Sequence, residues 1–133
     1  MVIRLRLLGA GAIVAVLLSG AAIEAHHSFA AEFDGNKPVT LRGTLKSVEL
    51  VNPHGWIHID VKNPDGSVTE WAIEAGAANQ LLKAGLRKTD FQIGTEVVVK
   101  GFLARNGKPI ANGTSVTLAD GRDFFLSSSR GAQ

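Results

Sequence analysis

Apolar and polar residues alternate along most of the chain after residue 38. In the stretch 39–51, one set of alternate positions carries valine, leucine and glycine up to Leu45, and the pattern shifts by one residue at Ser47. A period of two is typical of a β-strand with one buried face. A shift inside one long strand indicates a bulge that bends it. The sequence therefore predicts a long, bent first strand.

The same alternation predicts four more strands and one short helix. Asn63-Pro64-Asp65-Gly66 reads as a turn, because proline presets φ and glycine accepts the left-handed conformation. A three-residue loop at this turn would place Ile59 opposite Trp71, and Trp56 opposite Glu74, which keeps the apolar faces together. The predicted strands are 39–51, 56–62, 68–74, 95–103 and 115–118, and the helix is at about 77–84, before Gly85.

Three strands, a helix and two strands, with a long bent first strand, are typical of the OB-fold, a five-stranded partly open barrel. An SH3-like barrel is the alternative, but it has no natural place for the helix. We predict an all-β, OB-fold-like domain over 39–126, with an N-terminal arm at 26–38 and a flexible tail at 127–133. Phe91 and Ile93 should act as apolar plugs in the turn after the helix. The predicted core is Leu41, Leu45, Ile57, Ile59, Trp71, Ile73, Leu81, Leu82, Val97, Val99 and Val116.

Residues 1–25 have the order of a secretory signal. Arg4 and Arg6 precede an apolar stretch at 7–18, and small residues fill most of 19–25. Cleavage after Ala25 would leave His26 first, and cleavage after Ala21 or Ala22 also fits. The alternative is an uncleaved anchor, since 7–23 is at the lower limit for a membrane span. We expect cleavage, a periplasmic protein and no membrane span afterwards.

Charge and composition narrow the function classes. Without Arg4, Arg6 and Glu24, the totals of 14 basic and 12 acidic residues become 12 and 11, and the basic residues are spread among the acids. A nucleic-acid partner would need a basic stripe, so none is expected. The chain has no cysteine, which excludes thiol catalysis, iron–sulfur clusters and cysteine-based zinc sites.

Several separate segments of the chain carry a resemblance to other sequences. They are His26-His27-Ser28-Phe29-Ala30-Ala31-Glu32-Phe33-Asp34, Lys37-Pro38-Val39-Thr40-Leu41, Asn52-Pro53-His54, Trp71-Ala72-Ile73-Glu74 and Val116-Thr117-Leu118-Ala119-Asp120-Gly121-Arg122. Together they resemble one family of small exported bacterial proteins, domain of unknown function 6152. The resemblance spans His26 to about Phe125 and implies an envelope location and a barrel. It implies no reaction.

All four histidines fall in two places: His26 and His27 at the expected mature start, and His54 and His58 around the second strand. A terminal His26 could chelate one metal ion through its amine and its ring, and His27 or His54 could complete a square-planar nitrogen set typical of copper. The alternative is a polar N-terminus and a histidine that caps a turn. Copper is the only cofactor that the donor set suggests.

Trp56 and Glu74 form the candidate binding surface. On its strand, Trp56 should point outward together with His54 and His58, where it is either a binding platform or a surface covered by Phe29–Phe33 of the arm. No nucleophile, base and orienting group come together, and the carboxylates of Glu70 and Glu74 fit a solvated face better than a glycosidase pair. We therefore expect a binding or accessory module rather than an enzyme, with a small ligand or an envelope protein as partner. The alternative is a structural or protein-interaction domain without a small-molecule site.

Overall fold

The structure is a computed structural model that describes residues 28–126, most of which lie in β-strands. Histidines 26 and 27, the expected signal and the expected tail lie outside these residues. The elements, in chain order, are α1 (Phe29–Glu32), β1 (Phe33–Glu49), β2 (Gly55–Lys62), β3 (Val68–Ala75), α2 (Ala78–Lys83), a 3₁₀ helix η1 (Lys88–Asp90), β4 (Glu96–Ala104), β5 (Ile110–Thr117) and β6 (Asp123–Phe125).

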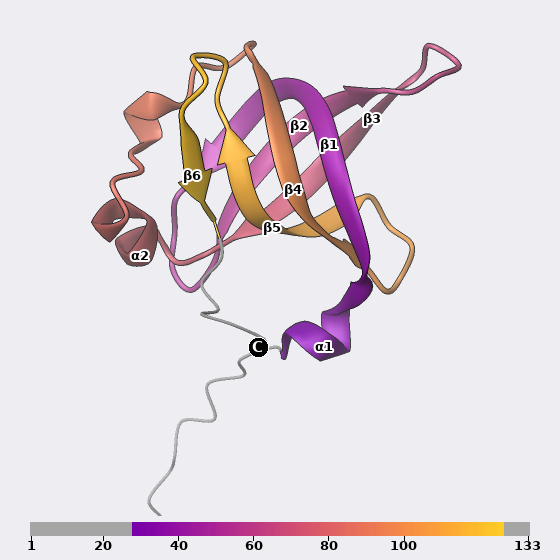
Figure 1. Cartoon of the computed structure of the whole chain (residues 1–133), viewed down its shortest axis with the longest axis horizontal. Helices are drawn as coiled ribbons and strands as arrows, with labels where there is room; N and C mark the ends of the chain where they lie inside the picture. Colours follow the sequence, from indigo (N-terminus) through magenta and orange to yellow (C-terminus); the bar gives the residue numbers. More distant parts are fainter. Residues whose placement is uncertain (1–27, 127–133) are drawn as a thin grey trace, which may run out of the picture.

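Five strands form a ring. Antiparallel pairing runs through β3, β2, β1, β4 and β5, and a parallel pairing of β3 with β5 at residues 72–74 closes the ring. The short β6 pairs with β5, and α2 lies between β3 and β4 in the chain (Figure 1). This is the OB-fold arrangement, so the predicted OB-fold-like barrel is confirmed, with β6 as an addition.

The first strand, β1, is long because it pairs with two different strands along its length. Its earlier part pairs with β4 and its later part with β2, over 17 residues in all. The pairing with β2 shifts between Leu45 and Ser47, which is where the alternation in the sequence shifts. The predicted bulge is confirmed. The strand starts at Phe33, six residues before the predicted start at Val39.

The β2–β3 hairpin has the predicted register. Ile59 pairs with Trp71, Ile57 with Ile73, and Trp56 with Glu74. The backbone N–H of Asn63 donates to the carbonyl of Ser67 at 2.8 Å and closes the loop. A slip of one residue would turn Ile57 and Ile59 outward, so the turn and the apolar pattern select the same pairing.

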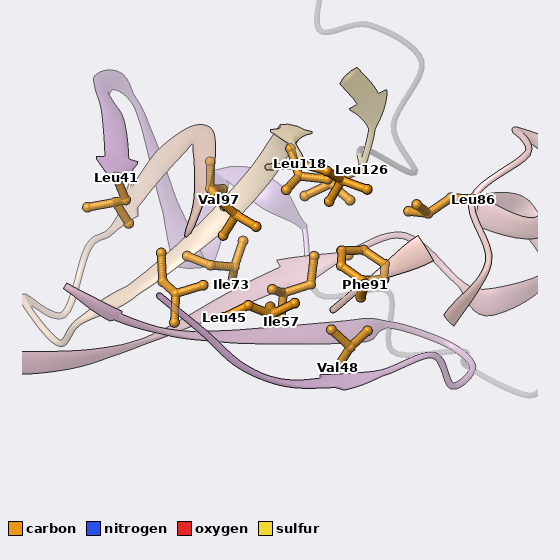
Figure 2. Packing of buried hydrophobic residues seen from close by; sticks show 14 of the residues in the cluster. Leu41, Leu45, Val48, Ile57, Ile73, Leu86, Phe91, Val97, Leu118 and Leu126 are labelled. Carbon is orange, nitrogen blue, oxygen red and sulfur yellow. The ribbon is translucent and has the colours of Figure 1, made fainter. Parts of the chain in front are cut away.

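The core fills the ring, and nine of the eleven predicted core residues are buried in one cluster (Figure 2). Leu82 is the first exception, with 49% of it exposed. Neighbouring helix positions point about 100° apart, so only Leu81 of this short helix faces the barrel. Trp71 is half-buried against the core, because β3 pairs with β5 only from Ala72 onward.

Several core residues come from segments whose pattern did not indicate burial. Phe91 is buried as predicted, but Ile93 is 62% exposed, since the turn that ends at Gly94 carries it to the surface. The predicted core also lacked Phe33, Val48, Ala75, Leu86, Ala111, Leu118 and Leu126, all of which are buried.

The fifth strand starts at Ile110, five residues before the predicted start at Ser115. The dipeptide Asn112-Gly113 reads as a turn, but here it lies inside the strand. A Cβ at Gly113 would lie 2.8 Å from Ile73 Cγ2 and 2.9 Å from Leu126 Cδ1. Glycine is therefore needed for close packing at this position, and its presence does not mark a turn.

Candidate functional site

A cleft of about 490 Å³ opens between the N-terminal arm and the outer face of the barrel. One wall comes from α1 and the start of β1, another from the β4–β5 loop, and the floor from β2, β3 and the start of β5. Figure 1 shows α1 at the foot of β1, beside the β4–β5 loop. The cleft is lined by Ala31, Glu32, Phe33, Trp56, Glu74, Ala104, Arg105, Asn106 and Ile110.

Aromatic packing and Arg105 hold the arm in place. The ring of Phe29 stacks on that of Phe33, with 5.8 Å between centroids, and meets Phe102 edge-on at 5.6 Å. The Arg105 backbone N–H donates to the carbonyl of Glu32 at 2.8 Å, and its Nε donates to the carbonyl of Ala30 at 2.9 Å. The arm is thus tied to the β4–β5 loop, which gives the cleft a fixed wall.

The floor of the cleft contains both residues of the predicted binding surface. Trp56 and Glu74 are direct cross-strand partners and line the cleft together. Trp56 is half-buried, and Ala31 and Phe33 of the arm line the same cleft. The arm therefore lies on the side of the barrel that carries Trp56, with the cleft between them.

His54 lies next to the floor, in contact with Glu74. Its Nδ1 is 3.5 Å from Oε1 of Glu74, and the two side chains are 29% and 13% exposed. The distance suits an ion pair, but the geometry does not make a hydrogen bond. Nδ1 is buried and has no hydrogen-bond partner among the residues described. Nδ2 of Asn112, on β5, donates to the same Oε1 at 3.4 Å.

His58, which lies within β2, has a different environment. Its Nδ1 is 3.3 Å from Oε1 of Glu70, and Lys46 donates a short hydrogen bond to Oε2 of that carboxylate. The hydrogen bond from Lys46 holds the pKa of Glu70 below its usual value, and the same bond raises the pKa of Lys46. Neither histidine lines the cleft, but the partner of His54, Glu74, does, and the partner of His58, Glu70, does not.

The four candidate metal ligands therefore fall into three locations. His54 is beside the cleft, His58 is next to Glu70, which also pairs with Lys46, and His26 and His27 precede the described residues. Within 28–126, no three histidine, aspartate or glutamate side chains gather closely enough to hold a metal ion. The predicted copper site combines His26, which lies outside the described residues, with His27 or His54.

The residues that sequence reasoning missed come from the arm and the β4–β5 loop. Glu32, Arg105 and Asn106 line the cleft, but their local pattern shows only a polar start and a turn, whereas Phe33 belongs to the segment that the sequence offered as a cover for Trp56. The available signal was the fold itself, because OB-folds bind ligands on the face of strands 2 and 3 with help from the loop between strands 4 and 5.

A family model matches residues 13–115 of the chain, and its description is a family of unknown function, DUF6152. The chain belongs to this family. The match covers the cleft floor and both walls, including Trp56, Glu74 and the β4–β5 loop. A search of curated proteins found no match. In the part of the chain that the structure describes, no helix is both long and apolar enough to cross a membrane.

Proposed function

We propose that this domain is an exported, periplasmic binding module that holds Cu(II) in the cleft between its N-terminal arm and the barrel. Export is supported by the basic, apolar and small-residue order of residues 1–25. The proposed ligands are the terminal amine and ring of His26, with His27 or His54 as further nitrogen donors. The role is binding rather than catalysis. The rival reading is a structural or protein-interaction domain of the envelope.

The observation that carries this proposal is the contact of His54 with Glu74, which lines the cleft together with Ala31 and Glu32 of the arm. Because Phe29–Glu32 is helical, only the two steps from Ser28 to His26 can be extended, over at most about 7 Å. The proposal therefore requires the His26 amine to bind the ion within this reach of Ser28.

The chemistry of this donor set favours copper. An α-amine and imidazole nitrogens suit a square-planar Cu(II) ion, which heads the affinity order of the common divalent metals. All of these donors bind in their deprotonated form, so copper affinity should fall as the pH drops through the imidazole range. His58 fits the set less well, because four residues of strand separate it from His54 by about 13 Å.

The test compares two N-termini. The first residue of protein from the envelope fraction is determined by mass spectrometry, and it should be His26. Copper is then titrated by calorimetry into protein that starts at His26 and into protein with one extra residue before it. Tighter binding by the first would support the proposal. Equal affinities would show that the terminal amine is not a ligand, and no binding tighter than about micromolar in either would favour the structural reading.

A fluorescence measurement tests whether the copper ion lies in the cleft. Cu(II) quenches nearby tryptophan fluorescence, and Trp71→Phe leaves Trp56, in the cleft floor, as the only tryptophan. Stoichiometric copper should quench this variant strongly. Binding without quenching would place the metal away from the cleft.

A further inference from the structure

The floor of the cleft places an aromatic side chain next to a carboxylate. Trp56 and Glu74 are direct cross-strand partners, so their Cβ atoms lie about 5 Å apart on the same face of the sheet. The Glu74 side chain is only 13% exposed, and Nδ2 of Asn112 donates to its Oε1 at 3.4 Å. A positive charge that rests on the tryptophan would therefore also lie close to a half-buried carboxylate.

The rest of the lining supplies apolar surface from more than one wall. Phe33 adds a second aromatic side chain from the start of β1, and Ile110 adds an aliphatic one from the start of β5. Ala31 and Ala104 complete the apolar part. A volume of about 490 Å³, with apolar side chains and a few polar groups around it, is typical of sites for small organic molecules.

The charges of the lining favour a positive ligand. Two of the lining residues, Glu32 and Glu74, are acids, and one, Arg105, is a base. The guanidinium of Arg105 is engaged with the arm, because its Nε donates to the carbonyl of Ala30 at 2.9 Å and its Nη1 lies 3.9 Å from Oδ2 of Asp34. The lining therefore carries more negative than positive charge, and the apolar walls of a cleft strengthen the attraction of such a lining for a cation.

The described lining suits an organic cation better than a metal ion held by these residues alone. A metal ion needs several donor atoms around it, and residues 28–126 contain no group of three histidine, aspartate or glutamate side chains that could hold one. An ammonium ion with alkyl groups needs no such coordination. It is attracted to the face of a tryptophan ring, more strongly as water is excluded, and its alkyl groups bury apolar surface.

We propose that the cleft binds a small organic ammonium ion, with its charge beside Trp56 and Glu74 and its alkyl groups against Phe33 and Ile110. The inference goes beyond the proposed function and does not depend on it. It uses only residues that the structure describes, and it requires neither a metal ion nor a donor from residues 26 and 27.

The first experiment changes the charge of the probe and keeps its shape. Choline is titrated into protein freed of metals with a chelator, in parallel with dimethylbutanol, the alcohol in which carbon replaces the charged nitrogen. In ¹H–¹⁵N spectra, the indole N–H signal of Trp56 should move with choline, while that of Trp71, which does not line the cleft, should stay. The neutral probe should bind at least about five-fold more weakly, which corresponds to a modest cation–π contribution. Equal binding of the two probes, or no shift at Trp56 with choline, would overturn the inference.

The second experiment removes each contact and includes a matched control. Trp56→Leu keeps an apolar side chain and should weaken choline binding by about 5–30-fold, the range of a cation–π contact. Glu74→Gln keeps the shape and removes the charge, and should weaken binding by about ten-fold. Glu70→Gln removes the same charge from the same strand outside the cleft and should leave the affinity unchanged. Broadening of the choline methyl signal measures binding in every variant. Equal losses in Glu74→Gln and Glu70→Gln would indicate a general charge effect and would overturn the inference.

The outcomes are distinct from those of the copper titration. If the protein binds choline but no copper, the proposed function fails and the inference stands. If it binds copper but no choline, the inference fails and the proposed function stands. Circular dichroism checks that each variant is folded, and the comparison of the two probes on the wild type tests the inference without any variant.

Discussion

Two histidine–glutamate pairs lie four residues apart along the β2–β3 hairpin, with His54 just before β2, and they have different surroundings. His54 faces Glu74 at 3.5 Å, and His58 faces Glu70 at 3.3 Å. Glu74 is only 13% exposed and lines the cleft beneath the arm, whereas Glu70 is 48% exposed and is shared with Lys46. The same kind of histidine–glutamate contact occurs at two places on the hairpin. Only the one with Glu74 lies at the cleft formed by the arm and the β4–β5 loop.

The repetition follows from strand geometry. His58 pairs directly with Ala72, so its contact with Glu70 is diagonal, two residues away on the partner strand. His54 stands just before Gly55, which pairs with Ala75, and it reaches Glu74 along the same diagonal. Diagonal neighbours are within reach of long side chains. What distinguishes the two pairs is therefore the tertiary structure above them and not their local sequence.

The largest expected effect on stability comes from truncating the core side chain that lies between the two glutamates. Ile73 lies on β3 between the two glutamates, and it is fully buried. Ile73→Ala should lower the free energy of unfolding by about 2–5 kcal/mol, because it leaves a cavity in the core. Urea unfolding measures this. Val68→Ala, at a position 61% exposed on the same strand, is the control and should change stability by no more than about 0.5 kcal/mol. A similar small loss for Ile73→Ala would contradict its place in the core.

A smaller effect is expected from a substitution that should disturb His54 and Glu74 without disturbing His58 and Glu70. A Cβ at Gly101 would overlap the carbonyl of Asn112, the residue whose side chain holds Glu74. We expect Gly101→Ala to cost about 1–3 kcal/mol through overpacking. It should also shift the NMR signals of the His54 ring while those of His58 stay in place. Equal shifts at both rings would mean that the two pairs are not independent.

The smallest effect on stability is expected from the exposed ion pair of Lys46 and Glu70. Lys46 holds the pKa of Glu70 below its ordinary value of 4.5, so the ionised carboxylate favours the folded state. This stabilisation is present above the ordinary pKa and is lost as the pH falls through the lowered one. Lys46→Met should therefore reduce the loss of stability between about pH 7 and pH 3, by a small amount because the pair is exposed. Thermal melts at the two pH values measure it, with Lys62→Met on the same hairpin as the control. An unchanged pH dependence in Lys46→Met would show that the Lys46–Glu70 ion pair does not contribute to stability.

Local patterns were enough to predict the barrel and the hairpin. The shift of alternation at Ser47 and the turn at Pro64-Asp65-Gly66 each determine a backbone geometry through neighbouring residues, and both features are present. The start of β5 was missed because the same residue, Gly113, can serve a turn or a tight contact. Only the positions of Ile73 and Leu126, distant in sequence, decide between the two.

The candidate site was predictable only in part for the same reason. Trp56 and Glu74 follow from strand register, and their shared place in the cleft floor agrees with the predicted pairing. The walls depend on long-range contacts: Phe29 packs on Phe102, and Arg105 binds the backbone of the arm. The sequence offered Phe29–Phe33 as one of two possibilities for covering Trp56, but no local pattern reports the contacts that fix the arm to the β4–β5 loop.

The central claim is that His54, and not His58, belongs to a copper site built with the N-terminus. The most direct measurement is a parallel titration of Cu(II) into the wild type, His54→Ala and His58→Ala, all beginning at His26 and all shown to be folded. We expect His54→Ala to weaken copper binding by at least about ten-fold, the lower end of the loss seen when a metal site loses a supporting group, and His58→Ala to bind like the wild type. Equal losses in both variants, or a loss in His58→Ala alone, would contradict it.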